Sequence, residues 1–159
     1  MSAPTEYRVA TAEEMHALGV RLGQGLGAGD LLVLTGPLGA GKTTLSRGIG
    51  EGLGVRGPVT SPTFVLARTH PNLGDGAPLV HVDAYRLSSA LELDDLDIDF
   101  ARSVVLMEWG AAFAASLAEE WTEVTIVRPT GAGAAGQDAD DLGGDEPRTV
   151  RIERRSATA

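Results

Sequence analysis

The sequence predicts one α/β domain with a mainly parallel sheet and antiparallel edge strands. Short apolar runs alternate along the chain with segments of helical periodicity, and a glycine-rich loop joins one apolar run to the helix after it. Strands that alternate with helices form parallel pairs, because the helix provides the crossover that a parallel connection needs. We expect the two terminal strands to pair with each other and to add the antiparallel edges. A length of 159 residues fits a single domain.

The chain begins with a predicted strand and helix. The strand covers residues 6–9, and the helix starts at an N-cap residue, Thr11, with Glu14 three positions later as in a capping box. One face of this helix is apolar, and glycines and an aspartate at residues 27–30 end it. The apolar face comprises Met15, Leu18, Leu22 and Leu26.

A glycine-rich loop follows the second strand, at residues 31–35. The segment GPLGAGKTT matches G-x-x-x-x-G-K-[ST] in full, and Lys42 is the only lysine among 13 lysine and arginine residues. A compact ammonium fits between phosphate oxygens better than a planar guanidinium does. Gly39 and Gly41 let backbone N–H groups turn toward an anion, and the Thr43 hydroxyl suits Mg²⁺. The pattern predicts a nucleotide-binding P-loop NTPase with a three-layer fold; the alternative is a glycine-rich turn that happens to contain lysine.

The helix after this loop is expected from Lys42 to about Glu51, where Gly52 and Gly54 end it. Its positive N-terminal end favours an anion. Further strands are expected at residues 63–68, 79–83, 103–107, 123–127 and 149–153, with a helix at 111–120.

The segments between these elements are polar. Residues 69–78 are expected to form a connection that contains proline and glycine, and Ser89 with Glu92 resembles a capping box that leads into the acidic segment 92–99. Residues 130–147 contain almost no bulky apolar side chains, so they cannot bury enough surface to offset their ordering entropy. We expect a flexible loop there, with an ordered acidic lid as the alternative.

Two predicted strands end in an acid, as a P-loop protein needs for its metal site. Asp83 ends one strand, and Glu108 ends the more apolar one. His81 shares a strand face with Asp83, and its ordinary interpretation is a hydrogen-bonded, half-buried histidine. Ser61 to Thr63 lie where nucleotide switches carry a γ-phosphate sensor. Trp109 either packs on the core or faces a partner.

Composition limits the possible partners. The net charge of −9 argues against a large nucleic-acid footprint, because neutralising phosphates requires clustered lysine and arginine. No apolar run approaches the roughly 20 residues that cross a bilayer, so no membrane association is expected. The absence of cysteine fits a reducing compartment, and neither a signal peptide nor an extracellular location is expected. We expect a cytoplasmic protein.

The ordered segments GPLGAGKTT, TSPTF, HVDAYRL and MEWG resemble the TsaE (YjeE) family, over about residues 11–127. The resemblance implies a bacterial ATPase needed for the threonylcarbamoyladenosine (t6A) modification of tRNA position 37. It implies Mg²⁺ and ATP as cofactors, and action on a complex of TsaB and TsaD that holds the tRNA.

The resemblance also assigns residues. Asp83 and Glu108 would act with Lys42 in catalysis, and Thr43 and Glu108 would hold the metal. Residues 60–64 would form the switch-like loop, and the base would lie near residues 11–13. The full set of ATP-binding residues would be Gly39, Ala40, Gly41, Lys42, Thr43, Thr44 and Arg128. Pro37, Gly110 and the long segment 130–147 depart from the family pattern, and the last puts assignments beyond Arg128 in doubt.

Other functions fit parts of the pattern. A small-molecule or nucleotide kinase needs an arginine-rich lid, yet the chain has no arginine between Arg128 and Arg148. A GTPase needs a guanine-reading N-K-x-D motif, and residues 72–75 resemble it without its lysine. A nucleotide-gated binding module without significant turnover is the third alternative.

Overall fold

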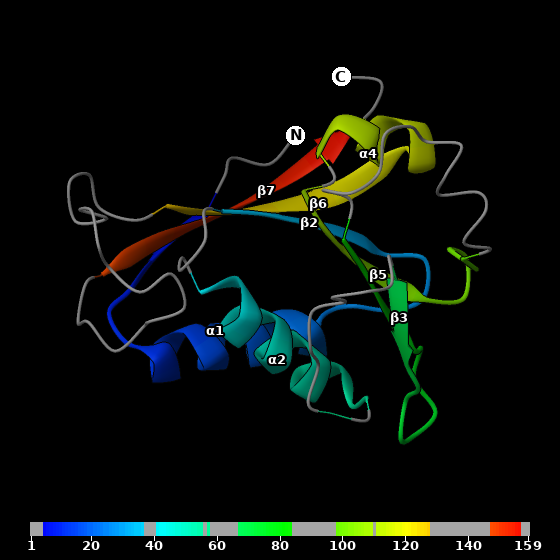
Figure 1. The fold of residues 1–159 in the computed structure, drawn as a ribbon, viewed down its shortest axis with the longest axis horizontal. Helices are drawn as coiled ribbons and strands as arrows, with labels where there is room; N and C mark the ends of the chain where they lie inside the picture. Colours follow the sequence, from blue (N-terminus) through cyan, green and yellow to red (C-terminus); the bar gives the residue numbers. More distant parts are fainter. Residues whose placement is uncertain are drawn as a thin grey trace.

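The fold is a seven-stranded sheet with helices on both faces (Figure 1). The computed structural model describes residues 5–36, 41–55, 57, 67–83, 98–109, 111–127 and 147–156. The elements in chain order are β1 (Thr5–Val9), α1 (Ala12–Gln24), β2 (Leu31–Thr35), α2 (Lys42–Leu53), β3 (Ala67–His70), β4 (Leu79–Asp83), β5 (Val104–Glu108), α4 (Ala111–Leu117), β6 (Glu120–Val127) and β7 (Arg148–Ser156).

The sheet has a parallel centre and antiparallel edges. The strand order is β1-β7-β6-β2-β5-β4-β3, and β6, β2, β5 and β4 run parallel to one another. At one edge β1 pairs antiparallel with β7, which confirms the predicted pairing of the terminal strands. At the other edge β3 pairs antiparallel with β4.

Two apolar cores lie on opposite faces of the sheet. The neighbouring residues Leu32 and Val33 of β2 point to different faces, and both are fully buried. One core packs against α1 and α2, which lie side by side, and the other packs against α4 (Figure 1). A parallel strand covered on both faces is a nearly continuous apolar run, as β2 and β5 are until their last residues, Thr35 and Glu108. The three-layer α/β arrangement agrees with the prediction.

The helix ends partly follow the predicted signals. The Thr11 side chain accepts a hydrogen bond from the Glu14 amide at 3.1 Å, and the Glu14 carboxylate accepts one from the amide of Ala10 at 2.7 Å, which confirms the N-cap. The predicted end of α1 was wrong, because the helix stops at Gln24 and Leu26 lies beyond it. Leu26 still packs against the core from the following turn.

The predicted end of α2, in contrast, was too early. Gly52 lies inside this helix, and Gly54 ends it in a left-handed conformation, with a φ of 90°. Gly52 belongs to a close contact between α1 and α2 in which glycines of one helix face the backbone of the other. For example, a Cβ added to Gly48 would fall on the carbonyl oxygen of His16. The glycines of this contact are Gly19, Gly23, Gly48 and Gly52.

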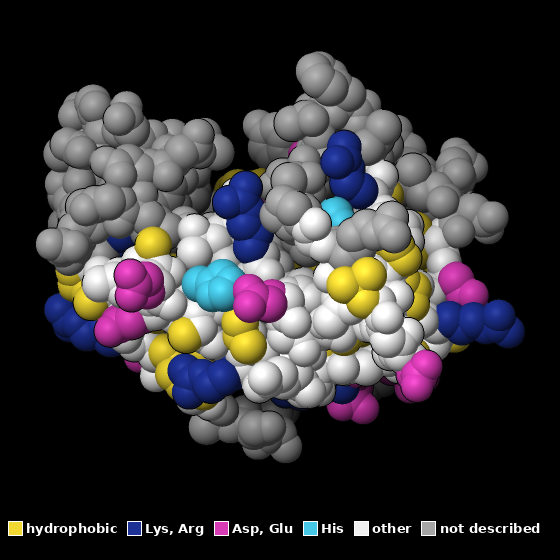
Figure 2. All heavy atoms as spheres, turned by 90° about the horizontal axis from the view of Figure 1, so that it is seen from below, with side chains coloured by type: hydrophobic (Ala, Val, Ile, Leu, Met, Phe, Trp, Pro, Cys, Tyr) yellow, Lys and Arg dark blue, Asp and Glu magenta, His cyan; other side chains and the backbone are white. Residues whose placement is uncertain are grey.

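The outer surface of these two helices carries both charged and hydrophobic side chains (Figure 2). The His16 ring of α1 contacts the Glu51 carboxylate of α2 at 2.7 Å. Acidic, basic and histidine side chains are interspersed on the described part of this face (Figure 2).

Several predicted boundaries need correction. Of the strand predicted at residues 63–68, residues 63–66 lie outside the described residues. Residues 67 and 68 belong to β3, which extends to His70 because residues 67–70 pair with β4 in an antiparallel hairpin, so the predicted connection begins only at Pro71. The helix predicted at 111–120 ends at Leu117, since residues 120–122 already belong to β6 and pair with β7. β7 is likewise longer than predicted, at Arg148–Ser156. The calls on residues 84–97 and 130–146, and on the switch-like loop at 60–64, lie outside the described residues.

Candidate functional site

The candidate site lies at the carboxyl ends of the parallel strands. Glu108 ends β5 and Asp83 ends β4, and the two residues are partners in the strand register. β5 pairs with β4 on one side and with β2 on the other. β2 precedes Lys42, the first residue of α2, in the chain. Parallel strands present their carboxyl ends at one sheet edge, where α/β proteins bind ligands. The sheet therefore brings together the lysine and the two acids that the sequence predicted.

Gly41 shapes the start of α2. It is the N-cap residue and has a left-handed conformation, with a φ of 107° that favours glycine. A glycine cannot cap the first helical N–H groups with a side chain. An uncapped helix start with its positive dipole end favours an anion.

Three side chains form a buried polar cluster at this edge. The Lys42 ammonium lies 3.7 Å from Oε1 of Glu108, and Nε2 of His81 lies 2.6 Å from Oε2 of the same carboxylate. Lys42, Glu108 and His81 are all buried, and His81 is fully inaccessible to solvent. The two oxygens of Glu108 thus face two different partners.

Burial governs the ionisation of Lys42. Desolvation lowers the pKa of its ammonium below the ordinary 10.5, and the negative charges of Glu108 and Asp83 oppose this shift only in part. The ammonium therefore lies in an environment that disfavours its charge. Phosphate oxygens placed beside it would supply the additional negative charge that this environment lacks.

Trp109 covers the same ammonium from another side. The Lys42 Nζ atom lies 4.1 Å from the centroid of the indole ring, within the range of a cation–π contact. Trp109 has a φ of 63°, which a large L residue rarely adopts, and its amide donates a hydrogen bond to the Leu34 carbonyl at 3.2 Å. Trp109 is 38% exposed to solvent. It therefore contacts the site and also reaches the surface, and its contact with a partner stays a prediction.

The other predicted site residues lie either beside Lys42 or outside the described residues. Thr43 is exposed and Thr44 half-buried in the first turn of α2, beside Lys42. Gly39, Ala40 and Arg128 lie outside the described residues. Within the described ranges, no group of three or more histidine, cysteine, aspartate or glutamate side chains could hold a metal ion.

The contact between His81 and Glu108 was missed by the sequence interpretation. His81 is hydrogen-bonded as expected, but it is fully buried rather than half-buried. The signal was present, because His81 shares a face with Asp83 and the neighbouring parallel strand ends in Glu108. The register in which β4 pairs with β5 would have been needed to show that His81 reaches Glu108.

The segment that resembles a guanine-reading motif has a structural role. The Asn72 amide donates hydrogen bonds to the carbonyl oxygens of Leu53 and Ala77, both at 3.0 Å, and its oxygen accepts one from the Gly74 amide at 2.7 Å. These bonds tie the β3–β4 connection to the end of α2. Asn72 also precedes β4, so it lies at the sheet edge opposite to Lys42.

The fold and the site define an α/β protein with a buried lysine–carboxylate cluster at the carboxyl edge of its parallel strands. The chain belongs to the TsaE family: the family model described as Threonylcarbamoyl adenosine biosynthesis protein TsaE matches residues 9–134. This confirms the resemblance seen in the sequence motifs. TsaE proteins take part in the biosynthesis of threonylcarbamoyladenosine in tRNA.

Individual relatives agree with this assignment. A Streptomyces coelicolor protein named tRNA threonylcarbamoyladenosine biosynthesis protein TsaE is 57% identical over 131 residues, which cover 80% of this chain and 85% of the relative. A Bacillus subtilis protein of the same name is 36% identical over 127 residues, or 77% of each chain. The crystal structure of Bacillus subtilis YdiB is similar with a TM-score of 0.66 and 29% identity, covering 96% of this chain and 86% of that one.

Among the helices of the described residues, none has the length and apolar character needed to cross a membrane.

Proposed function

We propose that this chain binds ATP with Mg²⁺ at the carboxyl edge of its sheet and hydrolyses it to support the t6A modification of tRNA. Its target is a protein complex of the TsaB–TsaD type, and tRNA is reached only through that complex. The observation that carries the proposal is the buried Lys42 ammonium at the start of α2, 3.7 Å from the carboxylate that ends β5. Membership of the TsaE family supports the pathway.

The described residues fit a nucleoside triphosphate. Lys42 and the first-turn amides of α2 supply positive charge and N–H donors for phosphate oxygens. Thr43 is exposed beside them, where its hydroxyl is free of the core. Glu108 and Asp83, paired in register, supply carboxylate oxygens of the kind that Mg²⁺ prefers. A Mg²⁺ ion held by these carboxylates would supply positive charge against the charge that develops on the phosphates.

The chain's own residues divide the remaining work. Lys42 leaves Glu108 and binds the phosphates, which satisfies an ammonium that burial disfavours. Glu108 and Asp83 hold the metal or orient the attacking water at the strand ends. Trp109 loses its cation when Lys42 moves, so its conformation depends on whether nucleotide is bound. A partner that contacts Trp109 could then distinguish the two states.

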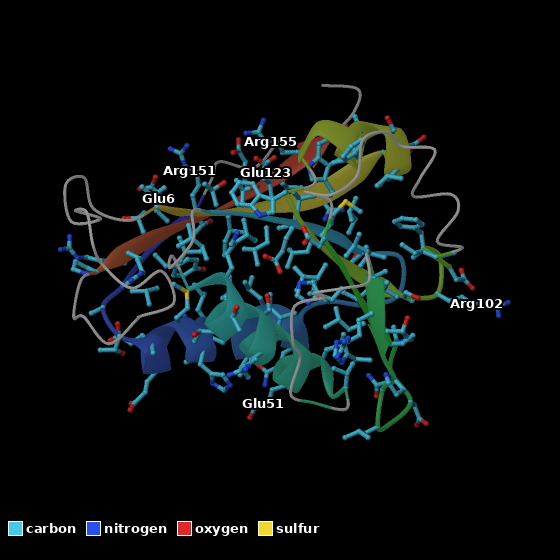
Figure 3. The ribbon with its side chains drawn as sticks, viewed as in Figure 1. Glu6, Glu51, Arg102, Glu123, Arg151 and Arg155 are labelled. Atoms are coloured by element: carbon cyan, nitrogen blue, oxygen red, sulfur yellow. The ribbon has the colours of Figure 1, made fainter. Side chains whose placement is uncertain are left out.

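Surface charge supports an indirect route to tRNA. The described arginines of β7 that face solvent are paired with glutamates on its own or neighbouring strands. Figure 3 labels two of them, Arg151 and Arg155, with their partners Glu6 and Glu123. Arg151 lies 3.3 Å from Glu6, and Arg155 lies 3.0 Å from Glu123. Paired arginines offer little net charge to a phosphate backbone, and the whole chain carries −9.

Complementation tests the proposal. Bacteria depleted of their own TsaE lose t6A, and we expect expression of this chain to restore it, whereas its Lys42→Ala variant should not. Steady-state ATPase assays with and without TsaB–TsaD then separate the alternatives. A kinase would depend on a phosphate acceptor, and a binding module would show no turnover. Restoration by Lys42→Ala, or failure of a well-expressed wild-type chain, would refute the proposal.

A further inference from the structure

Two of the groups that contact the Glu108 carboxylate differ in their freedom to move, because Lys42 has a flexible stem and His81 lies within a strand. We propose that His81 is a positioning residue that keeps the Glu108 carboxylate in place when Lys42 turns to bound nucleotide. The inference rests on the proposed function, because it concerns the state in which ATP has drawn Lys42 away. It adds a residue that is not assigned to phosphate or metal binding.

The fixed partner is set by the sheet. His81 lies in the middle of β4, paired in register with Leu106 of β5, and none of its surface is exposed. An ionised carboxylate only accepts hydrogen bonds, so the 2.6 Å contact places the proton on Nε2 of His81, which donates to Oε2 of Glu108. Lys42 instead reaches Oε1 through a four-carbon stem with several rotatable bonds.

The other ring nitrogen strengthens the argument. Nδ1 of His81 is buried and has no hydrogen-bond partner within the part of the chain that the structure describes. Burying a polar ring is unfavourable unless its groups are paired, and the adjacent strand residues Val80 and Val82 are apolar. Packing alone therefore gives no reason for histidine at this position. The bond to Glu108 gives one.

The consequence follows from the burial of Glu108, which is 8% exposed. When Lys42 binds phosphate, the carboxylate loses a cation that faces Oε1. The His81 bond still holds Oε2, and removing that bond as well would leave the carboxylate freer to rotate away from the position its function needs. Outer-shell residues of this kind typically change activity or metal affinity by 10–100-fold when they are replaced.

Three substitutions separate the hydrogen bond from packing. His81→Gln keeps an amide N–H at about the reach of Nε2, His81→Asn keeps the same amide on a shorter stem, and His81→Leu removes the donor. Val82→Ala is the matched control, since Val82 is also fully buried on β4 but faces the opposite core. It perturbs the strand without touching Glu108.

Two readouts are measured for each full-length variant. The first is kcat and KM for ATP in the presence of TsaB–TsaD. The second is the calorimetric Kd for ATP with Mg²⁺ and with EDTA, which needs no turnover. We expect kcat to fall about 10–100-fold in His81→Leu and His81→Asn, with KM changed less than about threefold and the Mg²⁺ effect on Kd reduced. His81→Gln and Val82→Ala should stay close to wild type in both readouts.

Each other outcome decides against the inference. Wild-type kcat and Mg²⁺ response in His81→Asn would show that the bond to Glu108 has no functional role, even if His81→Leu fails to fold. Equal losses in His81→Gln and His81→Asn would show that the ring's packing matters instead. A wild-type chain that binds no ATP would refute the proposed function as well, whereas wild-type turnover with unaffected variants refutes only the role of His81.

Discussion

Replacing Lys42 with methionine removes the ammonium while keeping an unbranched side chain of similar length. Two effects on the unliganded protein oppose each other. Burial disfavours the charged ammonium, so its removal is favourable, whereas Glu108 loses a cation 3.7 Å away. Breaking a buried ion pair usually costs about 3–5 kcal/mol because the remaining charge is left uncompensated. Here His81 still bonds Glu108, so we expect the free energy of unfolding to fall by less than about 3 kcal/mol.

The substitution is expected to have a clearer effect on the stabilisation by Mg-ATP, which the wild type should show and Lys42→Met should lack. At a concentration of Mg-ATP about 100 times its Kd, binding stabilises a protein by about 2.7 kcal/mol. For a chain of this size, each kcal/mol raises Tm by about 2–4 °C, so the wild type should gain about 5–11 °C. Lys42→Met should gain almost nothing, because the ammonium that meets the phosphates is gone.

Thermal unfolding with a non-hydrolysable ATP analogue and Mg²⁺ measures this difference without turnover. Arg47→Met is the matched control, because Arg47 is an exposed cation of the same helix. It should show the wild-type shift in Tm. If Lys42→Met shifts as much as the wild type, Lys42 does not contact the phosphates and the site is misassigned.

The pH dependence of the unliganded protein gives a second measurement on the same pair. The pKa of Lys42 is lowered in the folded state, so between that value and 10.5 the unfolded chain binds more protons than the folded one. The free energy of unfolding of the wild type should therefore rise with pH across this interval, as the unfavourable buried charge is lost. Lys42→Met lacks this contribution. A difference between the two proteins that does not change with pH would contradict the burial argument.

Three further predictions concern the rest of the molecule. Gly48→Ala should lower the free energy of unfolding by about 1–3 kcal/mol in denaturant titrations, because its Cβ would meet the His16 carbonyl, whereas Gly27→Ala, with no atom within 4 Å, should leave it unchanged or slightly higher. Glu108→Gln should weaken the Mg²⁺ dependence of ATPase activity more than it weakens folding, and an unchanged metal response would move the metal role to Asp83. Calorimetry should show tighter binding of ATP than of GTP; equal or tighter GTP binding would sink this preference.

Much of the fold followed from local sequence signals. Leu31 to Leu34 and Val104 to Met107 are apolar at every position, which indicated strands covered on both faces, and both are central strands. The Thr11 cap was evident from residue types at fixed spacing. The acids Asp83 and Glu108 were assigned to one sheet edge because parallel strands end together. Each inference needed only neighbours in sequence or one rule of sheet geometry.

The errors arose where packing or strand pairing overrides the preference of single residues. Gly52 looked like a helix stop because glycine disfavours helices, yet α2 continues through it. Glycine is needed at this position because the α1 backbone packs too closely to leave room for a side chain. Thr69 and His70 looked like part of a polar connection because Pro71 and Gly74 follow, but pairing with β4 keeps them in a strand. The Val20 backbone that meets Gly52 is distant in sequence, so no local pattern could report that contact, whereas β4 follows β3 directly and only the boundary of the hairpin was misplaced.

The same distinction explains why the site was predicted as a set of residues but not as a geometry. His81 and Glu108 are 27 residues apart, and only the parallel pairing of β4 with β5 brings Nε2 to the carboxylate. Residue types could assign a lysine and two acids to one edge, but they could not show that one carboxylate faces both the lysine and a histidine. That sharing matters under the proposed function. A lysine at the start of a helix can exchange Glu108 for phosphate, whereas a histidine fixed within a strand cannot move with it, so the carboxylate keeps its place while its charge partner changes.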